Sequence, residues 1–167
     1  MKKRRIFIAI NLPREIKKKL SAFKENWPQL PVRWTKTENL HITLEFLGYV
    51  KDEDLPEVFK KVEKMALSQR PFAVKLNKIC FGPLGFFSGQ IPRMIWAVGK
   101  SSTKLGVVIH ITLGRIRKWD WQRIDPEDRP EIIQDIDLNF SVNSVEVMES
   151  ILKKGGPEYV VLKSFNF

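Results

Sequence analysis

The sequence predicts an α+β fold built mainly from antiparallel strands, and three observations support this class. Segments with alternating or β-branched apolar residues outnumber the segments with helical spacing. Several strand segments follow one another with only short connections, which favours antiparallel pairing. No low-complexity segment or interdomain linker interrupts the 167 residues, which are too few for two domains of ordinary size. We therefore expect a single domain over residues 1–167.

The first half of the chain alternates strands with helices. We expect strands over residues 4–11, 32–36 and 41–48, and helices over residues 13–27 and 52–69. The first helix starts at a proline, which suits a first turn, and carries apolar residues at helical spacing: Ile16, Leu20, Phe23 and Trp27. The second helix starts with acidic residues and carries one apolar stripe: Leu55, Val58, Phe59, Val62, Met65 and Ala66. Both stripes are expected to pack in the core.

The second half is richer in strands. Strands are expected over residues 72–81 and 93–99, on either side of a turn-rich stretch, 82–92, and again around residues 110–113. The polar segment 117–135 contains two prolines and predicts a surface excursion. Residues 137–152 and 158–167 predict a closing hairpin around a Gly-Gly-Pro turn.

Composition narrows the class of protein and of partner. With 43% hydrophobic and 29% charged residues, and apolar runs far shorter than a bilayer requires, we expect a cytoplasmic protein with no membrane partner. A single cysteine excludes an internal disulfide, and one Cys with two His disfavours a zinc cage, so we expect no metal or other cofactor. The net charge of +10 points to polyanionic partners, although solubility alone also explains a basic surface.

Both histidines of the chain begin the same tetrapeptide, His-Ile-Thr-Leu, at His41 and at His110. Because side chains alternate along a strand, His41 and Thr43 share one face, and His110 and Thr112 share the equivalent face of the second strand. The aliphatic residues between them face the core. Two such strands side by side, related by a pseudo-twofold axis, form a cleft with two imidazoles and two hydroxyls.

This set of groups suits hydrolysis of a phosphate ester without a metal ion. A neutral imidazole takes a proton from water while an imidazolium donates one to the leaving oxygen. The hydroxyls of Thr43 and Thr112 are able to donate hydrogen bonds to phosphate oxygens. A single histidine on a strand is more often structural than catalytic, but a matched pair with matched hydroxyls favours catalysis.

The two His-x-Thr elements and their surroundings resemble the two-histidine (2H) phosphoesterase superfamily, in its RNA 2',3'-cyclic phosphodiesterase or 2'-5' RNA ligase branch. The similarity begins at RIFIAINLP and runs through VRWTKTENLHITLEFLGYV, PRMIWAVG and HITLGR to VNSVEVMESILKKGGPEYVVLKSFNF. It implies two pseudo-symmetric lobes of antiparallel sheet with outer helices and a central cleft. It further implies opening of a terminal 2',3'-cyclic phosphate to a 2'-phosphomonoester by a monomer, and in some members formation of a 2'-5' linkage in RNA.

The resemblance also implies roles for individual residues. His41 is the expected proton donor to the leaving 3' oxygen, and His110 the expected base for water. Thr43 and Thr112 would hold the phosphate. Phe46 and Arg115, each five residues after a histidine, would flank the nucleobase of an RNA end or a nucleotide. Strict alternation conflicts with this role, because it turns both residues toward the core unless the strands bulge. For Phe46 a core position remains an equal alternative, and Trp34 is expected in the core.

One region departs from the family pattern. Residues 99–109 replace an amphipathic helix, so the second lobe is expected to be trimmed, with residues 117–135 covering the gap, or to carry a deletion. The alternative function is accordingly a catalytically impaired RNA-binding module of the same fold. A third possibility is a ligase or a phosphodiesterase for cyclic nucleotide metabolites that uses the same two histidines.

Overall fold

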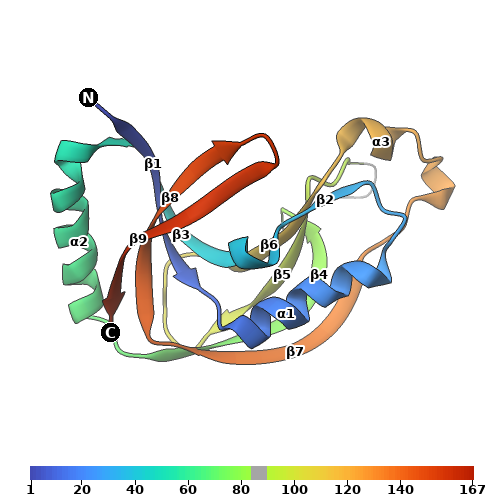
Figure 1. The fold of residues 1–167 in the computed structure, drawn as a ribbon. Coiled ribbons are helices and arrows are strands. Elements are labelled where there is room, and N and C mark those ends of the chain that lie inside the picture. Colours follow the sequence, from blue (N-terminus) through green and yellow to red (C-terminus); the bar gives the residue numbers. More distant parts are fainter. Residues whose placement is uncertain (84–89) are drawn as a thin grey trace.

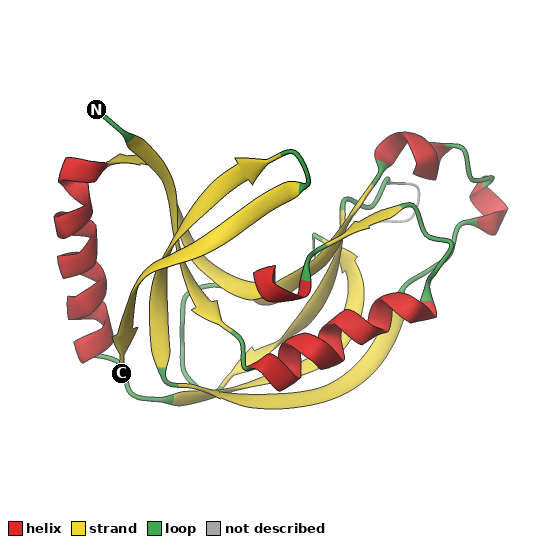
Figure 2. Ribbon diagram, in the orientation of Figure 1, coloured by secondary structure: helices red, strands yellow, loops and turns green. Residues whose placement is uncertain are grey.

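Two antiparallel sheets make up most of the computed structural model, which describes residues 1–83 and 90–167 (Figures 1 and 2). The first sheet has the strand order β3-β1-β8-β9, and the second has the order β2-β6-β5-β4-β7. The strands of the first sheet are β1 (Lys3–Asn11), β3 (His41–Lys51), β8 (Ser144–Lys153) and β9 (Gly156–Asn166). The strands of the second are β2 (Val32–Trp34), β4 (Phe72–Gly82), β5 (Met94–Ser101), β6 (Ile109–Ile116) and β7 (Ile133–Val142). The predicted α+β class is confirmed, while residues 84–89 of the expected turn-rich stretch lie outside the described residues.

Each sheet is covered by one of the two longer helices (Figure 2). Helix α2 (Leu55–Leu67) packs Val62 and Ala66 against the first sheet, in a core with Ile6 and Val147. Helix α1 (Arg14–Ala22) continues into a short 3-10 turn (Phe23–Asn26) and buries its apolar face in the larger core of the second sheet. Within the described part of the chain, no helix combines the length and the apolar character needed to span a bilayer.

Strand β1 is central to the first sheet, which explains why its apolar residues run without interruption. Ile6 and Ile8 face the core under α2, whereas Phe7 and Ala9 face the opposite side and pack against Met148 of β8. A strand with both faces covered loses the apolar and polar alternation of a half-exposed one. On that side the Phe7 ring packs beside His41, with ring centroids 5.1 Å apart.

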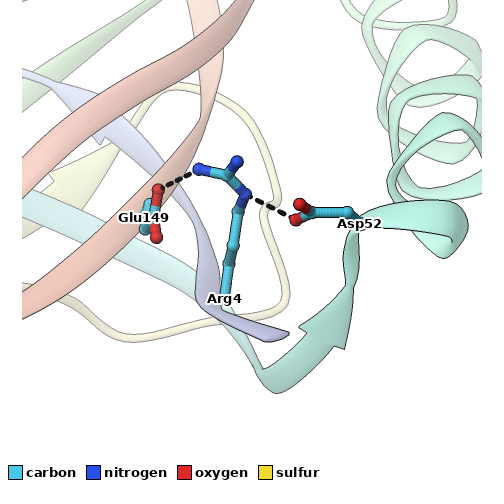
Figure 3. A network of polar contacts seen from close by, with 3 residues as sticks. All are labelled: Arg4, Asp52 and Glu149. Carbon is cyan, nitrogen blue, oxygen red and sulfur yellow. Dashed lines mark hydrogen bonds and ion pairs between the residues drawn. The ribbon is translucent and has the colours of Figure 1, made fainter. Parts of the chain in front are cut away.

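An ion network fastens the start of β1 to two other elements (Figure 3). Arg4 donates from Nε to Asp52 Oδ1 at 2.6 Å and from Nη1 to Glu149 Oε2 at 2.8 Å. Asp52 begins the 3-10 turn that leads into α2, and Glu149 lies on β8. The hydrogen bond from Arg4 lowers the pKa of Asp52, so the carboxylate stays ionised as Arg4's partner. The network therefore joins β1, β8 and the start of α2.

The C-terminal part of the chain differs from the prediction in two ways. Residues 137–152 do not form one strand, because the ladder breaks at Asn143 between β7, in the second sheet, and β8, in the first. Only β8 pairs with β9, so the predicted closing hairpin is correct for that half alone. The break occurs because the chain crosses from one sheet to the other at this point. The crossing is part of the tertiary arrangement, and no local turn signal in the sequence marks it.

The segment 117–135 is not simply a surface excursion. It contains helix α3 (Lys118–Gln122) and the first residues of β7, and it buries Trp121 and Ile132 in the larger core. Residues 99–109 complete β5, form a loop and enter β6. The second sheet does not depend on a helix from that region, because α1 from the N-terminal half supplies its helical cover.

Candidate active site

The two His-x-Thr strands meet at the edges of their sheets. Strand β3 is the edge strand of the first sheet, and β6 is covered by β2 only from Gly114 to Ile116. Strand β6, whose free part carries His110 and Thr112, approaches β3 so that Cα atoms of the two strands come within 8 Å (Figure 1). The two motifs, 69 positions apart in the sequence, are thereby brought together across the junction of the sheets.

A cleft of about 340 Å³ opens at this junction. Its walls come from β3, β5 and β6, from the segment around β2, and from the turn between β8 and β9. All six residues singled out in the sequence line it: His41, Thr43, Phe46, His110, Thr112 and Arg115. The structure thus brings the whole candidate set to one cavity, with both imidazoles on its surface.

A β-bulge lies at the leucine of each His-Ile-Thr-Leu motif. In β3, Thr43 and Glu45 pair with consecutive residues of β1, which leaves Leu44 as the extra residue. In β6 the equivalent shift against β5 makes Leu113 the extra residue. A bulge of this kind reverses the inward and outward alternation of the residues that follow it.

The bulges resolve the conflict between strand alternation and the expected positions of Phe46 and Arg115. Phe46 pairs with Phe7 and shares a face with the histidine, and its side chain is 73% exposed, so the alternative of a core position is wrong. Arg115 reaches the cleft in the same way from β6. Trp34 is half-buried and packs on the core as expected, but it also lines the cleft.

Each imidazole ring is fixed by the same kind of contact, with the backbone carbonyl group two residues before it. Nδ1 of His41 lies 2.7 Å from the carbonyl oxygen of Asn39, and Nδ1 of His110 lies 3.0 Å from that of Val108. A carbonyl oxygen only accepts, so each Nδ1 carries a proton and donates it. In the neutral rings Nε2 is therefore the basic atom. Nε2 of His41 lies 2.7 Å from Thr43 Oγ1, whose hydroxyl donates to the neutral ring.

His41 sits in an aromatic pocket that changes its acidity. Its ring centroid lies 5.1 Å from that of Phe7 and 5.2 Å from that of Tyr159. Burial lowers the pKa of His41 below its ordinary value of 6.5, and the hydrogen bond to Asn39 opposes this shift only in part. The positive charges of Lys17 and of a protonated His110 lower the pKa further.

We expect His41 to titrate below 6.5 and the Lys17→Met variant to move its pKa upward. Lys17 donates from Nζ to the carbonyl oxygen of Glu38 at 2.8 Å, which holds its charge near the ring. The shift should leave the pKa below 6.5, because burial is the larger cause. Proton NMR of the imidazole signals measures it directly, since only two histidines contribute.

The matched control for this measurement is Lys18→Met, which removes an exposed charge one residue away on the same helix. This control should leave the His41 titration in place. A His41 midpoint at or above 6.5, or equal shifts from both lysine variants, would contradict the origin given for the lowered pKa.

Several residues of the cleft escaped the sequence analysis. Trp96 of β5 stacks on His110 with ring centroids 4.1 Å apart, and Tyr159 of β9 meets the edge of His41. Asn39 holds the His41 ring through its carbonyl, and its own side-chain Nδ2 donates to Pro157 O at 2.8 Å. Trp96 and Tyr159 come from strands whose partners are remote in sequence, and Asn39 from a short 3-10 turn, so no local pattern indicated them.

The cleft walls carry cations and no carboxylate among the residues that the structure describes. Residues 1–83 and 90–167 also contain no group of three His, Cys, Asp or Glu side chains placed to hold a metal ion. The groups available for chemistry in the cleft are therefore imidazoles, hydroxyls, guanidiniums and an ammonium group.

The sequence is similar to a known family and to several characterised proteins. Residues 10–83, which include the first motif, match the family model "LigT like Phosphoesterase". The RNA 2',3'-cyclic phosphodiesterase of Methanocaldococcus jannaschii is 29% identical, over 96% of this chain and 99% of that protein. The protein of the same name from Thermotoga maritima is 25% identical, over 98% of this chain and 95% of its own length.

Solved structures show the same fold over the full length. TT0787 of Thermus thermophilus superposes with a TM-score of 0.78 at 23% identity, covering 97% of both chains. The E. coli LigT complexed with phosphate has a TM-score of 0.76 at 22% identity, covering 100% of this chain and 99% of that one. Matched to the family model over residues 10–83 and aligned with relatives over nearly its whole length, the chain is similar to the LigT-like phosphoesterases.

Proposed function

We propose that this protein is a metal-independent RNA 2',3'-cyclic phosphodiesterase that converts a terminal 2',3'-cyclic phosphate to a 2'-phosphomonoester. The observation that carries the proposal is the convergence of two imidazoles on one cleft, each anchored through Nδ1 so that Nε2 is the atom that exchanges protons. The relatives from M. jannaschii and T. maritima, which bear this activity in their names, support the same reaction. We expect the protein to act as a monomer.

In the proposed reaction His110 accepts a proton from water as the water oxygen attacks phosphorus. The bond from phosphorus to the 3' oxygen breaks, and His41 donates its Nε2 proton to that oxygen, giving a 3'-hydroxyl and a 2'-phosphate. The hydroxyls of Thr43 and Thr112 donate to the non-bridging oxygens as negative charge builds on them. The two histidines exchange protonation states in one turnover, and solvent restores them.

The charge state of the pair sets the pH dependence. His41 has a lowered pKa and is neutral in the free protein near pH 7, so it must gain its proton when the anionic phosphate binds beside Nε2. The working form holds one proton shared between two coupled rings, and both the doubly protonated and the doubly neutral forms are inactive. Activity should therefore follow a bell-shaped pH profile.

The decisive experiment is product analysis with purified protein in excess EDTA. A panel of nucleoside and oligonucleotide 2',3'-cyclic phosphates is incubated with the protein, and the products are separated and identified by phosphorus NMR. We expect turnover to the 2'-phosphate in the chelator. A 3'-phosphate product, or activity that appears only on adding a divalent metal, would overturn the mechanism. RNA binding without any turnover would identify the binding-module alternative, and a 2'-5' linked product would identify joining.

A further inference from the structure

Two arginines face each other at one end of the cleft. Arg33 of β2 and Arg115 of β6 are direct partners in the antiparallel ladder, and both line the cavity. Like charges directly opposite on one face of a sheet repel each other. Neither guanidinium forms an ion pair with a carboxylate in the described part of the chain. A pair of this kind is stabilised when a ligand supplies the negative charge.

The neighbours of both guanidiniums are uncharged or only weak acceptors. Gly156, with φ of +112°, lies against Arg33, and a Cβ atom there would come within 2.7 Å of its Nη2. Arg115 donates from Nη1 to the sulfur of Met94 at 3.8 Å, and a thioether is a weak acceptor. Lys36 adds a third cation to the cleft wall. The N–H donors of both guanidiniums therefore keep capacity to bind an anion.

The arginine pair is separated from the histidines along a single strand. His110 is the second residue of β6 and Arg115 the seventh. At about 3.3 Å per residue, with one residue taken up by the bulge, their Cα atoms are roughly 13 Å apart. A long arginine side chain spans about half of that distance. The pair therefore reaches a group of the substrate other than the phosphate held by the histidines.

We propose that Arg33 and Arg115 form a second phosphate subsite, which binds the phosphate on the 5' oxygen of the ribose whose 2',3'-cyclic phosphate reacts. The inference rests on the proposed function and extends it to the substrate class. Two guanidiniums provide planar, paired N–H donors that match phosphate oxygens. The Arg115 plane stays available to stack on the base while its edge donates.

The test compares three substrates with the same base. They are a nucleoside 2',3'-cyclic phosphate with a free 5'-hydroxyl, its 5'-phosphorylated form, and a dinucleotide ending in the same cyclic phosphate. We expect kcat/KM to be at least about tenfold higher for the two substrates with a second phosphate. In Arg33→Ala this preference should fall by about tenfold, mainly through KM, and Arg33→Lys should restore part of it. Arg70→Ala, which removes an exposed arginine outside the cleft, should keep the wild-type preference.

Equal rates on all three substrates, or equal losses on all three in Arg33→Ala, would overturn the subsite and leave the phosphodiesterase intact. A gain from the 5'-phosphate alone identifies a nucleotide as the occupant, whereas a gain with the dinucleotide identifies an RNA end. If no substrate is turned over, the proposed function fails, and calorimetry with a nucleoside 2'-phosphate and its 2',5'-bisphosphate tests the subsite separately. The bisphosphate should bind at least about tenfold more tightly, and an equal affinity for both would reject the subsite.

Discussion

Replacing His41 or His110 with alanine is expected to lower kcat/KM for a 2',3'-cyclic phosphate by about 10²- to 10⁴-fold in each case. Each substitution removes one Nε2 from the cleft, and the reaction needs both a proton acceptor for water and a donor for the 3' oxygen. The double variant should be little worse than either single variant, because the two groups act as a unit. Steady-state assays with product identification measure the effect.

The control for these variants is Trp119→Ala, which removes a ring that is 77% exposed on α3 and does not line the cleft. It should keep the wild-type rate. Thermal unfolding of each histidine variant separates loss of catalysis from loss of fold, since His41 also donates to the Asn39 carbonyl. Substantial turnover by the double variant would exclude the two imidazoles as the catalytic pair.

Replacing Gly99 with valine is expected to destabilise the protein by at least about 3 kcal/mol. A Cβ atom at Gly99 would overlap the carbonyl oxygen of Lys75 and lie 2.8 Å from Leu76 Cα, both in the backbone of the paired strand β4. A side-chain tip moves aside at low cost, but a backbone in the middle of a ladder moves only if β4 and β5 separate. Urea unfolding followed by circular dichroism measures the change.

Gly155→Ala is the matched control, because a Cβ there meets no atom within 4 Å and the backbone is not left-handed. It should change the free energy of unfolding by less than about 1 kcal/mol. A Gly99→Val protein as stable as the wild type would show that the two strands are less tightly paired than described.

The placement of the motif side chains could be predicted from the sequence because strand alternation is a short-range rule. It correctly put His41 with Thr43, and His110 with Thr112, on a polar face, with Ile42 buried opposite. The rule failed five residues further along each strand. A bulge depends on how two strands pair, and a strand's own residues do not specify its partner's register.

Tertiary arrangement explains the other differences. Residues 137–152 divide into two strands, and Trp121 is buried, because of where the second sheet ends in the folded protein. No short stretch of sequence specifies where a sheet ends. The contacts of Trp96 and Tyr159 with the histidine rings depend on cross-strand neighbours in the same way. Helix α1, read correctly as amphipathic, gave no indication that it would cover the second sheet.

The extra leucine in each motif strand allows two residues that are five positions apart to lie on the same face of the sheet. Leu44 packs against both cores and Leu113 is buried in the larger one, so core packing stabilises each bulge. An engineer who grafts this constellation onto a regular strand must shorten or lengthen the five-residue interval by one, or else Phe46 and Arg115 will point into the host's interior. The graft must therefore include the histidine, the threonine and the bulged leucine together.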